Sequence, residues 1–555
     1  MRVIHLIGGG DTGGAKTHVL NLLKELNQSI DAQLFCFRKG DFSEDAAKMG
    51  IPIEVIESGN PVVGLRELKR RLAGQKVDII HCHGARGNLM GNLVKKHLGA
   101  PVVTTVHSDY RLDYLGRPVA RLSYGTTNMV ALRRVNFYIG VSDPMTDILI
   151  ERGFPADRIY TIYNGIDFKT PIHPVPKEEF LQSVGMKWEP GDVIAGIAVR
   201  LSPVKDVPTL LRAMKIASEK DPHLKLLIGG DGEDRQKLEN MVKDLGLAGK
   251  VCFGGWLDDV NSFYNAIDIN LLTSISETFP YSLTEGTRMH KATIASKVGG
   301  VPVLIDDGVN GLIFEPGDEK QLAQHLLALS QNRELRETFG ERIYEKASRE
   351  FSIDRMVEHQ LEIYESILKR DARQKSRKRD GAVICGAYGY GNAGDDAILK
   401  SIIRSVQELD NAMPITVLAK NTKSIKKRYR VGSIYTFNLP KMVAAMRKSV
   451  LYINGGGTLI QNATSWRSLW YYLFTLRLAK LLGNKVDMYG CGIGPVTGKK
   501  NIRLVKRVLD RSVDTITLRE TDSMKELESF GVRRPEILLS SDPVSYTHLR
   551  AHETL

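Results

Sequence analysis

The sequence predicts an α/β protein made of Rossmann-like domains, and three observations lead to that prediction. Short apolar runs alternate with helical patterns along the whole chain, which is typical of parallel sheets covered by helices on both faces. The alternation is interrupted at a proline-rich stretch, residues 171–176, and at a basic stretch, residues 369–379. With 555 residues, the chain is also too long for a single hydrophobic core.

The first domain is expected over residues 1–168. It begins with the strand RVIHLIGG, passes through a glycine-rich turn and enters the helix KTHVLNLLKEL. Glycines between a strand and a helix let backbone amides and the helix N-terminus approach a phosphate, although about half of such loops are only tight turns. The glycines of this turn are Gly8, Gly9, Gly10, Gly13 and Gly14.

The second domain is expected over residues 190–350, where the alternation restarts with VIAGIAVR and LKLLIGG. Two such sheets in tandem place a cleft between two Rossmann-like domains. Residues 351–368 form an amphipathic helix that we expect to complete the first domain. Residues 369–380 have no apolar periodicity, so we interpret them as a solvated basic linker. Attachment of this stretch to a membrane surface or to nucleic acid is the alternative.

A third Rossmann-like unit is expected over residues 381–544, with strands in GAVICG, PITVLAK, SVLYING and KVDMYG. It is short, so we expect a truncated domain. The last residues, 545–555, follow neither a strand period nor a helix period, and we interpret them as a non-native tail.

The composition is that of a folded globular chain. Hydrophobic residues make up 42% and charged residues 25%, which excludes disordered and fibrous classes. No run approaches the roughly 20 apolar residues that cross a bilayer, and the start of the chain lacks a signal-peptide core. We therefore expect a cytoplasmic protein, either free or peripheral at the inner face of the membrane.

The five cysteines show no CxxC spacing, which argues against disulfides and zinc. The net charge of +13 suggests an anionic partner, and we do not expect nucleic acid.

The sharpest chemical signal is a pair of acids in the second domain. Glu277 and Glu285 are separated by seven residues, between a strand and a helix. Arg200 and Lys205 follow the first strand of the same domain, in VRLSPVKD. Surface cations paired with acids such as Asp206 are the alternative explanation of the two basic residues.

Together, the glycine-rich opening, the Arg/Lys pair and the E-x7-E pattern resemble the GT4 (group 1) glycosyltransferases over residues 1–370. The resemblance implies a GT-B fold and a metal-independent, retaining transfer from a UDP- or GDP-sugar, with no tightly bound cofactor. It also implies that Glu285 binds the ribose hydroxyls, that Glu277 lies near the transferred sugar, and that Arg200 and Lys205 stabilise the leaving diphosphate.

Further donor-site residues are implied by the same resemblance. Thr278 and Phe279 would lend backbone amides to the donor. His107 ends a strand at the edge where such folds bind ligands, although a lone histidine is often structural. The donor-binding glycines would be Gly13, Gly14, Gly230 and Gly232.

The acceptor is expected on the first domain, where basic residues gather. A glycan or an acidic lipid-linked glycan would suit them, and so would contact with an anionic membrane. A plain solvated face is the alternative. These residues are Arg66, Lys69, Arg70 and Arg71, with further basic residues between Arg111 and Arg134.

The third unit contains a literal GxGxxG at Gly389, Gly391 and Gly394, which suggests a dinucleotide. Lys420 stands where a ribose-binding acid would be expected, which argues against NAD. With YINGGGTLIQN, MYGCGIGPV and TLRETDS, the unit resembles the amino-terminal half of CsaB-type polysaccharide pyruvyl transferases. An intact enzyme of this kind would use phosphoenolpyruvate, and we expect the truncated unit to be inactive. A Rossmann-like module with stabilising glycine turns is the alternative. The implied anion- or acceptor-binding residues are Gly389, Gly391, Asn392, Gly394, Asp395, Gly455, Gly456 and Gly457.

The predicted function is therefore sugar transfer in bacterial envelope polysaccharide synthesis, fused to a partial pyruvyl transferase. Two other classes remain open. One is a carbohydrate-binding or scaffolding protein with a degenerate transferase fold, and the other is a GT-B sugar-nucleotide epimerase or phosphorylase. The retained Arg200, Lys205, Glu277 and Glu285 argue against degeneration.

Overall fold

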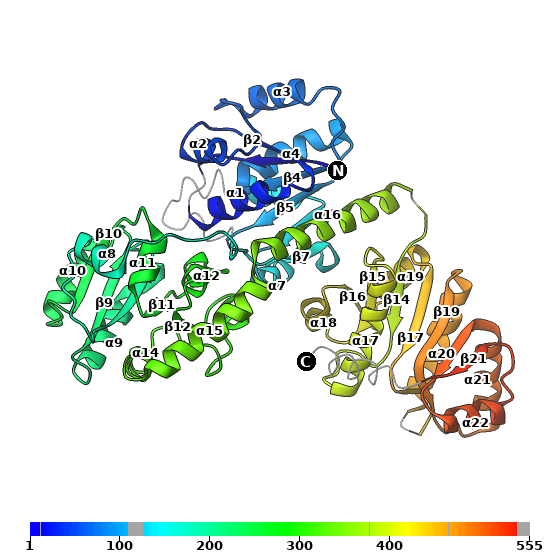
Figure 1. The fold of residues 1–555 in the computed structure, drawn as a ribbon. Coiled ribbons are helices and arrows are strands. Elements are labelled where there is room, and N and C mark those ends of the chain that lie inside the picture. The colour runs from blue at the N-terminus through cyan, green and yellow to red at the C-terminus, as the bar shows by residue number, and fades with distance from the viewer. Residues whose placement is uncertain (11–12, 109–125, 377, 464, 541–555) are drawn as a thin grey trace. The chain divides into compact units, whose positions relative to one another are not determined.

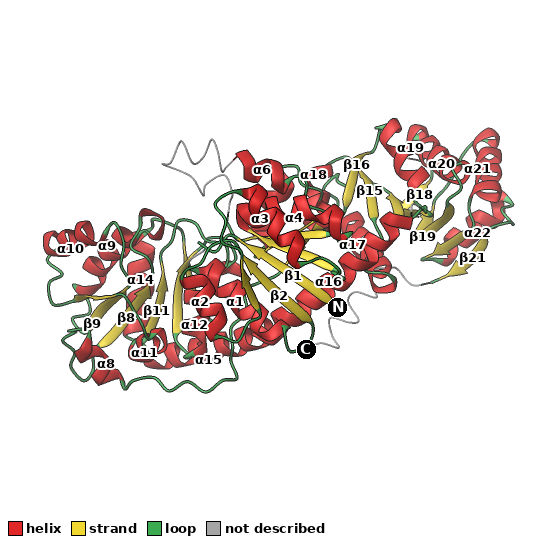
Figure 2. Cartoon of the chain, turned by 90° about the horizontal axis from the view of Figure 1, so that it is seen from above, coloured by secondary structure: helices red, strands yellow, loops and turns green. Residues whose placement is uncertain are grey.

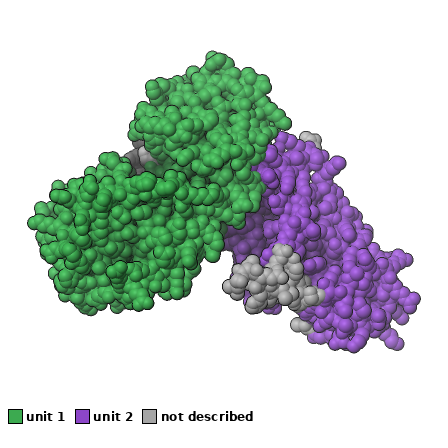
Figure 3. All heavy atoms as spheres, viewed as in Figure 1, with its two compact units in different colours: residues 1–148, 160–363 green, residues 149–159, 364–555 purple. Residues whose placement is uncertain are grey.

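The computed structural model describes residues 1–555 except 11–12, 109–125, 377, 464 and 541–555 (Figure 1). The chain forms two compact units (Figure 3). The first contains residues 1–148 and 160–363, and the second contains residues 149–159 and 364–555. The predicted non-native tail, residues 545–555, lies outside the described residues.

The first sheet of the first unit belongs to an amino-terminal lobe and has the strand order β3-β2-β1-β4-β5-β6-β7. Its pairs from β3 through to β6 are parallel. The strands are β1 (Arg2–Ile7), β2 (Asp31–Cys36), β3 (Ile53–Val55), β4 (Ile79–His83), β5 (Val102–Val106), β6 (Phe137–Gly140) and β7 (Ile159–Thr161). The helices are α1 (Gly14–Leu26), α2 (Asp41–Lys48), α3 (Pro61–Arg71), α4 (Gly84–Leu98), α6 (Thr126–Leu132) and α7 (Asp143–Glu151).

The second sheet of the same unit belongs to a carboxy-terminal lobe and has the order β10-β9-β8-β11-β12-β13, with every pair parallel. Its strands are β8 (Val193–Ala198), β9 (Leu224–Gly229), β10 (Val251–Gly255), β11 (Ile269–Leu272), β12 (Ala292–Ser296) and β13 (Leu312–Phe314). Its helices are α8 (Lys177–Ser183), α9 (Val207–Ser218), α10 (Arg235–Asp244), α11 (Val260–Ala266), α12 (Tyr281–Arg288), α13 (Val301–Leu304), α14 (Glu319–Ser330) and α15 (Arg333–Glu350).

A long helix, α16 (Ile353–Ser376), follows the second lobe. Its start pairs with the chain that leaves β7, because Ile166 bridges Ser352. The prediction that the helix ends at residue 368 is wrong, since it continues through most of the stretch interpreted as a linker. Lys, Arg, Gln and Ala are good helix formers, and Asp371 pairs with Lys375 one turn later at 2.5 Å.

The second unit holds the third sheet, in the order β16-β15-β14-β17-β19-β20-β21 with β18 beside β19. All described pairs are parallel. The strands are β14 (Ala382–Cys385), β15 (Ile415–Ala419), β16 (Gly432–Tyr435), β17 (Leu451–Gly455), β18 (Thr458–Ile460), β19 (Lys485–Ile493), β20 (Thr515–Leu518) and β21 (Glu536–Leu539). The helices are α17 (Ala393–Leu409), α18 (Thr422–Tyr429), α19 (Leu439–Lys448), α20 (Trp466–Leu481), α21 (Lys499–Ser512) and α22 (Thr521–Phe530).

Helices cover both faces of the sheets (Figure 2). Inner strands such as β6, β8 and β14 are buried at nearly every position, which explains why they appear in the sequence as continuous apolar runs and not as alternating ones. The predicted α/β class is confirmed. Parallel strands end at one edge of each sheet, and the loops at that edge carry the predicted site residues. Among the described helices, none combines the length and apolarity needed to cross a membrane.

Candidate active site

Lys205 and Glu277 lie in contact at the edge of the second sheet. The Lys205 Nζ atom is 2.5 Å from Glu277 Oε1, and both side chains are largely buried. Ser274 Oγ donates to the same carboxylate oxygen at 2.7 Å. The two residues belong to the loops after β8 and β11, which are joined by a bond from Thr273 Oγ1 to the Lys205 carbonyl at 2.8 Å. The loops therefore hold this ion pair in place.

Arg200 follows β8 on the same edge, with its side chain 72% exposed. Its guanidinium donates to Glu233 at 3.1 Å, in the loop after β9. This loop lies so close to the Arg200 segment that a Cβ on Gly230 would stand 1.9 Å from the Val199 carbonyl oxygen. A Cβ on Gly232 would stand 2.2 Å from the Leu201 carbonyl oxygen. The two glycines thus have a packing role in addition to the predicted donor contact.

Glu285 lies on α12 beside a cavity of about 280 Å³ between the two lobes. Asn21 and Lys24 of α1 and Asn261 of α11 also line this cavity. Burial raises the pKa of the Glu285 carboxyl, and a hydrogen bond from Tyr264 Oη at 3.3 Å opposes that rise. Polar and charged groups from both lobes therefore face one space next to the second acid of the E-x7-E pattern.

The glycine turn before α1 faces the second lobe. A Cβ on Gly14 would lie 3.6 Å from the ring of Tyr281 at the start of α12, whereas a Cβ on Gly13 would meet no described atom within 4 Å. Gly13 has φ of 62°, a left-handed value that glycine adopts without a steric cost. The N-terminus of α1 thus opens toward α12, as an anion-binding turn requires.

The segment after Glu277 connects the lobes. The Phe279 side chain is 2% exposed, and its carbonyl accepts a hydrogen bond from Asn164 Nδ2 at 2.7 Å. The Asn164 Oδ1 atom lies 2.9 Å from His18 Nδ1 on α1. The Thr278 carbonyl accepts from the Gly300 amide at 2.7 Å. The donor contacts predicted for the Thr278 and Phe279 amides stay predictions.

His107, itself half-buried, belongs to a cluster with the buried His5, His18 and His83 in the amino-terminal lobe. Its Nε2 atom lies 3.5 Å from His83 Nδ1, and His83 Nε2 lies 3.1 Å from His5 Nδ1. The His18 ring meets the His107 ring edge-on at 4.9 Å. Burial lowers the pKa of His107 and His83 well below the usual range, that of His18 to about 4 and that of His5 to about 3. The rings are therefore neutral at physiological pH.

Hydrogen bonds between the neutral rings of His5, His83 and His107 make the tautomer of each ring depend on that of its neighbour. Each carries one N–H donor and one acceptor nitrogen, so the two hydrogen bonds of His83 need opposite roles. If His83 donates to His107, it accepts from His5, and the reverse assignment reverses both bonds. The position of the proton on His107 therefore depends on the tautomers of His83 and His5.

His5 and His83 of this cluster, together with His81, are close enough to one another to be considered as metal ligands. Ring nitrogens of His5, His81 and His83 lie within 4.8 Å of one another. Hydrogen bonds account for this closeness, because His5 bonds to His83 and His81 Nε2 lies 2.8 Å from Thr105 Oγ1. The expectation of no metal in the site stays a prediction. Sequence reasoning missed His5, His18, His81 and His83, although histidines inside apolar strand runs such as HLI and HCH were a usable signal.

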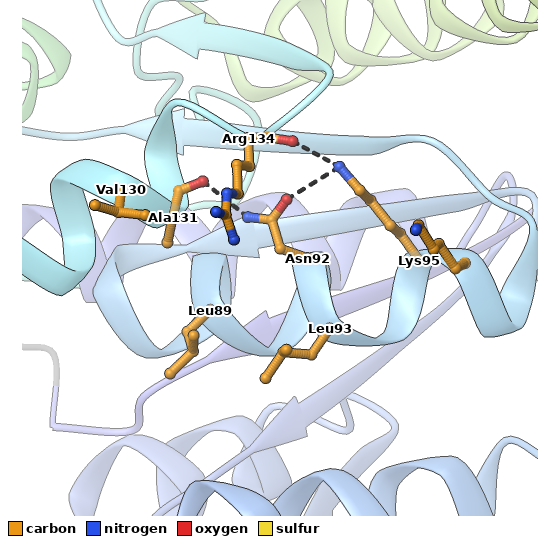
Figure 4. A pocket seen from close by; sticks show the side chains of 8 residues that line it. Leu89, Asn92, Leu93, Lys95, Val130, Ala131 and Arg134 are labelled. Carbon is orange, nitrogen blue, oxygen red and sulfur yellow. Dashed lines mark hydrogen bonds between the residues drawn. The ribbon is translucent and has the colours of Figure 1, made fainter.

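A separate groove of about 650 Å³ lies between α4 and α6 (Figure 4). Leu89, Leu93 and Val130 form its apolar part, and Lys95 donates to the Arg134 carbonyl at 2.6 Å beside it. Lys96 and the Arg134 side chain also line the groove, so it combines apolar surface with cations.

Some of the predicted acceptor cations are engaged with acids. Arg70 and Arg71 both donate to Glu67 at 2.7 Å, and Arg71 also reaches Glu54. Arg66 is exposed. Within the stretch from Arg111 to Arg134, residues 111–125 lie outside the described part of the chain.

In the second unit, the predicted glycine turns meet at the edge of the third sheet. Asn392 caps α17 by accepting from the Gly394 amide at 3.0 Å, and it donates to Asp395 at 2.9 Å. Burial raises the pKa of Asp395, and a hydrogen bond from the Gly457 backbone opposes the rise. The Tyr388 hydroxyl donates to the Gly455 carbonyl at 2.6 Å. The turns at residues 389–395 and 455–457 therefore form one cluster.

A buried amide, that of Asn454, lies next to last in β17, directly before Gly455 of this cluster. Asn454 has no exposed surface, and neither its Oδ1 nor its Nδ2 has a hydrogen-bond partner among the described residues. Lys420, which follows β15 directly, lies with its ammonium 4.8 Å from the centre of the Tyr390 ring. An unpaired buried amide is costly, and a bound polar ligand or water would relieve it.

Comparison with known proteins agrees with this arrangement. The family model for glycosyltransferase family 4 matches residues 12–170, that for glycosyl transferases group 1 matches residues 185–346, and that for polysaccharide pyruvyl transferase matches residues 392–551. N-acetyl-alpha-D-glucosaminyl L-malate synthase of Bacillus anthracis is 28% identical over 309 residues, which cover 54% of this chain and 78% of that protein.

Two further similarities extend the comparison. UDP-Gal:alpha-D-GlcNAc-diphosphoundecaprenol alpha-1,3-galactosyltransferase of Escherichia coli is 24% identical over 324 residues, covering 56% of this chain and 82% of that protein. The crystal structure of Anabaena Alr3699/HepE in complex with UDP is 22% identical, with a TM-score of 0.58, and covers 66% of this chain and 100% of that one. The same protein in complex with UDP-glucose gives a TM-score of 0.55.

Two facing Rossmann-like lobes with these loops define a GT-B glycosyltransferase, which is fused here to a further Rossmann-like domain. The chain belongs to the group 1, family 4 glycosyltransferases over residues 12–170 and 185–346, and it carries a polysaccharide pyruvyl transferase domain at residues 392–551. It is a glycosyltransferase of polysaccharide or glycoconjugate synthesis.

Proposed function

We propose that the first 370 residues transfer a sugar, with retention of configuration, from a nucleoside diphosphate sugar to a glycan or lipid-linked acceptor. The observation that carries the proposal is the Lys205–Glu277 contact, followed in the chain by Glu285 beside a cavity between the lobes. A cation for the leaving group and acids for sugar hydroxyls are the parts that such a transfer needs.

Lys205 would stabilise the negative charge that develops on the diphosphate as the bond to the sugar breaks. Its ammonium is fixed by Glu277 before the donor arrives, so little reorganisation remains for the reaction itself. Arg200, on the same sheet edge, is exposed, and it pairs with Glu233, which is also exposed, so a phosphate could displace that carboxylate. The acceptor hydroxyl would attack from the face that the diphosphate leaves, and the leaving phosphate would take its proton.

Glu285 would hold the ribose. A carboxylate accepts two hydroxyl hydrogen bonds in a defined geometry, and this one faces a cavity. UDP-sugars are the first donors to consider, because the similar Anabaena protein is described in complex with UDP and with UDP-glucose. His107 would contact the donor with a proton position set through His83.

The groove between α4 and α6 supports an amphipathic anionic acceptor. Its apolar side chains suit a lipid chain, and Lys95, Lys96 and Arg134 suit a phosphate. The similar Escherichia coli enzyme is named for a diphosphoundecaprenol-linked substrate. Arg66, which is exposed on α3, is a further candidate for contact with an anionic acceptor or a membrane surface.

The second unit would act on a polysaccharide with phosphoenolpyruvate. In pyruvyl transfer, one glycan hydroxyl oxygen replaces the phosphate oxygen on the enol carbon of phosphoenolpyruvate, and a second adds to the same carbon across its double bond, giving a ketal. One hydroxyl proton converts the enol methylene to a methyl group, and the other leaves with inorganic phosphate. The glycine turns at residues 389–395 and 455–457, with the unpaired amide of Asn454, are the groups that would bind the anion or the acceptor.

The test is a panel of UDP-, GDP- and ADP-sugars, screened by thermal shift and then by nucleotide release with and without acceptor. Release that depends on acceptor supports the transferase, whereas product formed without acceptor would indicate an epimerase. No nucleotide binding at all would support a scaffolding protein. Glu285→Gln should weaken donor binding, and Glu315→Gln, at an exposed glutamate on the same lobe, should not.

A further inference from the structure

The outer face of α20, in the second unit, is unusually apolar. Four large side chains repeat along it: Trp466 is 57% exposed, Trp470 52%, Phe474 47% and Leu481 74%. The opposite face, with Leu469, Tyr472, Leu473 and Leu476, is buried in the core of the unit. The helix is therefore well anchored, and its exposed apolar face is not explained by packing within the described part of this unit.

Basic residues outnumber acidic ones on the two helices that form this surface, and one of the basic residues, Lys480, is paired with Asp514. The sequence of α20 contains Arg467, Arg477 and Lys480 and no acid. The neighbouring α21 contains one acid, Asp510, whose carboxylate accepts from two backbone amides. Its exposed basic residues are Lys499, Lys500, Arg503, Lys506, Arg507 and Arg511.

The apolar and basic groups are contiguous. The Arg467 guanidinium lies 5.5 Å from the centre of the Trp466 ring, which meets Trp470 edge-on at 5.9 Å. At the other end of the helix, a cavity of about 160 Å³ is lined by Leu481 together with Arg477, Lys480, Arg507 and Arg511. One surface thus offers indole and phenyl rings with guanidinium groups beside them.

This combination matches the headgroup region of a membrane. Tryptophan is enriched at that depth because its ring is apolar and its N–H is polar, while arginine keeps its charge in water over an apolar stem. A second copy of the chain is a poorer occupant, because a two-fold contact through this face would bring the basic residues of both copies together. An anionic lipid surface instead neutralises them.

We propose that α20 and α21 form a membrane-contact surface that binds anionic bilayers peripherally. Trp466, Trp470 and Phe474 would enter the headgroup region, and the basic residues of both helices would lie among the lipid phosphates. The proposal rests on the second unit alone and does not depend on the sugar donor or on pyruvyl transfer.

Co-sedimentation of the full chain with vesicles tests the proposal. Binding is expected to vesicles that contain phosphatidylglycerol, and it should weaken in pure phosphatidylcholine and at high salt. Arg507→Glu with Arg511→Glu should lower binding by about tenfold or more. Trp470→Ser with Phe474→Ser should also lower it. Matched controls on the first unit are Trp256→Ser, at an exposed tryptophan, and Lys237→Glu with Lys243→Glu on α10.

A fluorescence measurement identifies the surface directly. The chain has four tryptophans, so Trp188→Phe with Trp256→Phe leaves only the two on α20. Their emission should shift to the blue on adding anionic vesicles and should be quenched by brominated lipid. An unchanged spectrum, or equal vesicle binding by all variants, would overturn the proposal. So would a dimer without vesicles that Trp470→Ser with Phe474→Ser converts to a monomer, because a second copy would then occupy the face.

Discussion

The ammonium of Lys205 lies 2.5 Å from a carboxylate oxygen of Glu277, although the two residues are 72 positions apart in the chain. The loops after β8 and β11 bring them together, and Ser274 donates to the same oxygen. Because Glu277 fixes the direction of the ammonium, a change at either residue should affect the reaction more than the fold.

Replacing Lys205 by alanine should slow sugar transfer more than it weakens donor binding. The loss of a cation from the developing diphosphate charge is expected to raise the barrier by about 2 kcal/mol, about thirtyfold in rate. Initial rates and a donor dissociation constant, measured on the same preparation, check this. Lys215→Ala removes the cation of an exposed pair, between Lys215 on α9 and Glu219 just after that helix, and should change neither quantity. Equal losses of rate and affinity in the Lys205 variant would contradict the assigned role.

Replacing His83 by phenylalanine should alter the tautomer of His107. His83 supplies the nitrogen that faces His107 Nε2, so its loss frees the choice of protonated nitrogen. Nitrogen chemical shifts of the His107 ring should report a mixed population, and the pH profile of kcat should move. His97→Gln, at an exposed histidine on α4, is the control. A single unchanged His107 tautomer in the His83 variant would rule out the coupling.

The first unit should lose stability as the pH falls from about 6.5 toward 3. The folded-state pKa is about 4 for His18 and about 3 for His5, below the 6.5 of an unfolded chain. The unfolded chain therefore binds more protons in this window, and the stabilisation is complete only above it. His18 alone accounts for about 3 kcal/mol. Thermal denaturation between pH 8 and pH 4 measures the effect, and His18→Asn should flatten the dependence. A melting temperature that does not change with pH in this window would contradict it.

Gly230→Ala should disturb the loop that contacts the Arg200 segment. The added Cβ would stand 1.9 Å from the Val199 carbonyl oxygen, in a backbone with φ of 111°. Gly249→Ala separates the two effects, because Gly249 has φ of 80° but no atom within 4 Å of the added Cβ. We expect the Gly230 variant to melt at the lower temperature and to bind donor more weakly. If both variants have the same melting temperature, the close approach of residue 230 to the Val199 carbonyl does not contribute to stability.

Much of the fold could be predicted from the sequence because parallel strands buried on both faces are continuous apolar runs. The E-x7-E pair could be predicted because its spacing is short and local, and the structure shows Glu277 at the predicted sheet edge and Glu285 on the helix that follows it. The partners of Arg200 and Lys205 could not be predicted, since they come from loops distant in the chain. The histidine cluster could not be assembled for the same reason: His5, His83 and His107 lie on three different strands or strand ends.

The side chain of Asn164 links the two lobes of the GT-B unit. Its Oδ1 atom is hydrogen-bonded to His18 Nδ1 of α1, and its Nδ2 donates to the carbonyl of Phe279, two residues after Glu277. Any hinge motion that separates the lobes at this point must break one of these two bonds. The loop bearing Glu277 then either follows the amino-terminal lobe or is released from it, so the Asn164 side chain couples domain opening to the position of Glu277.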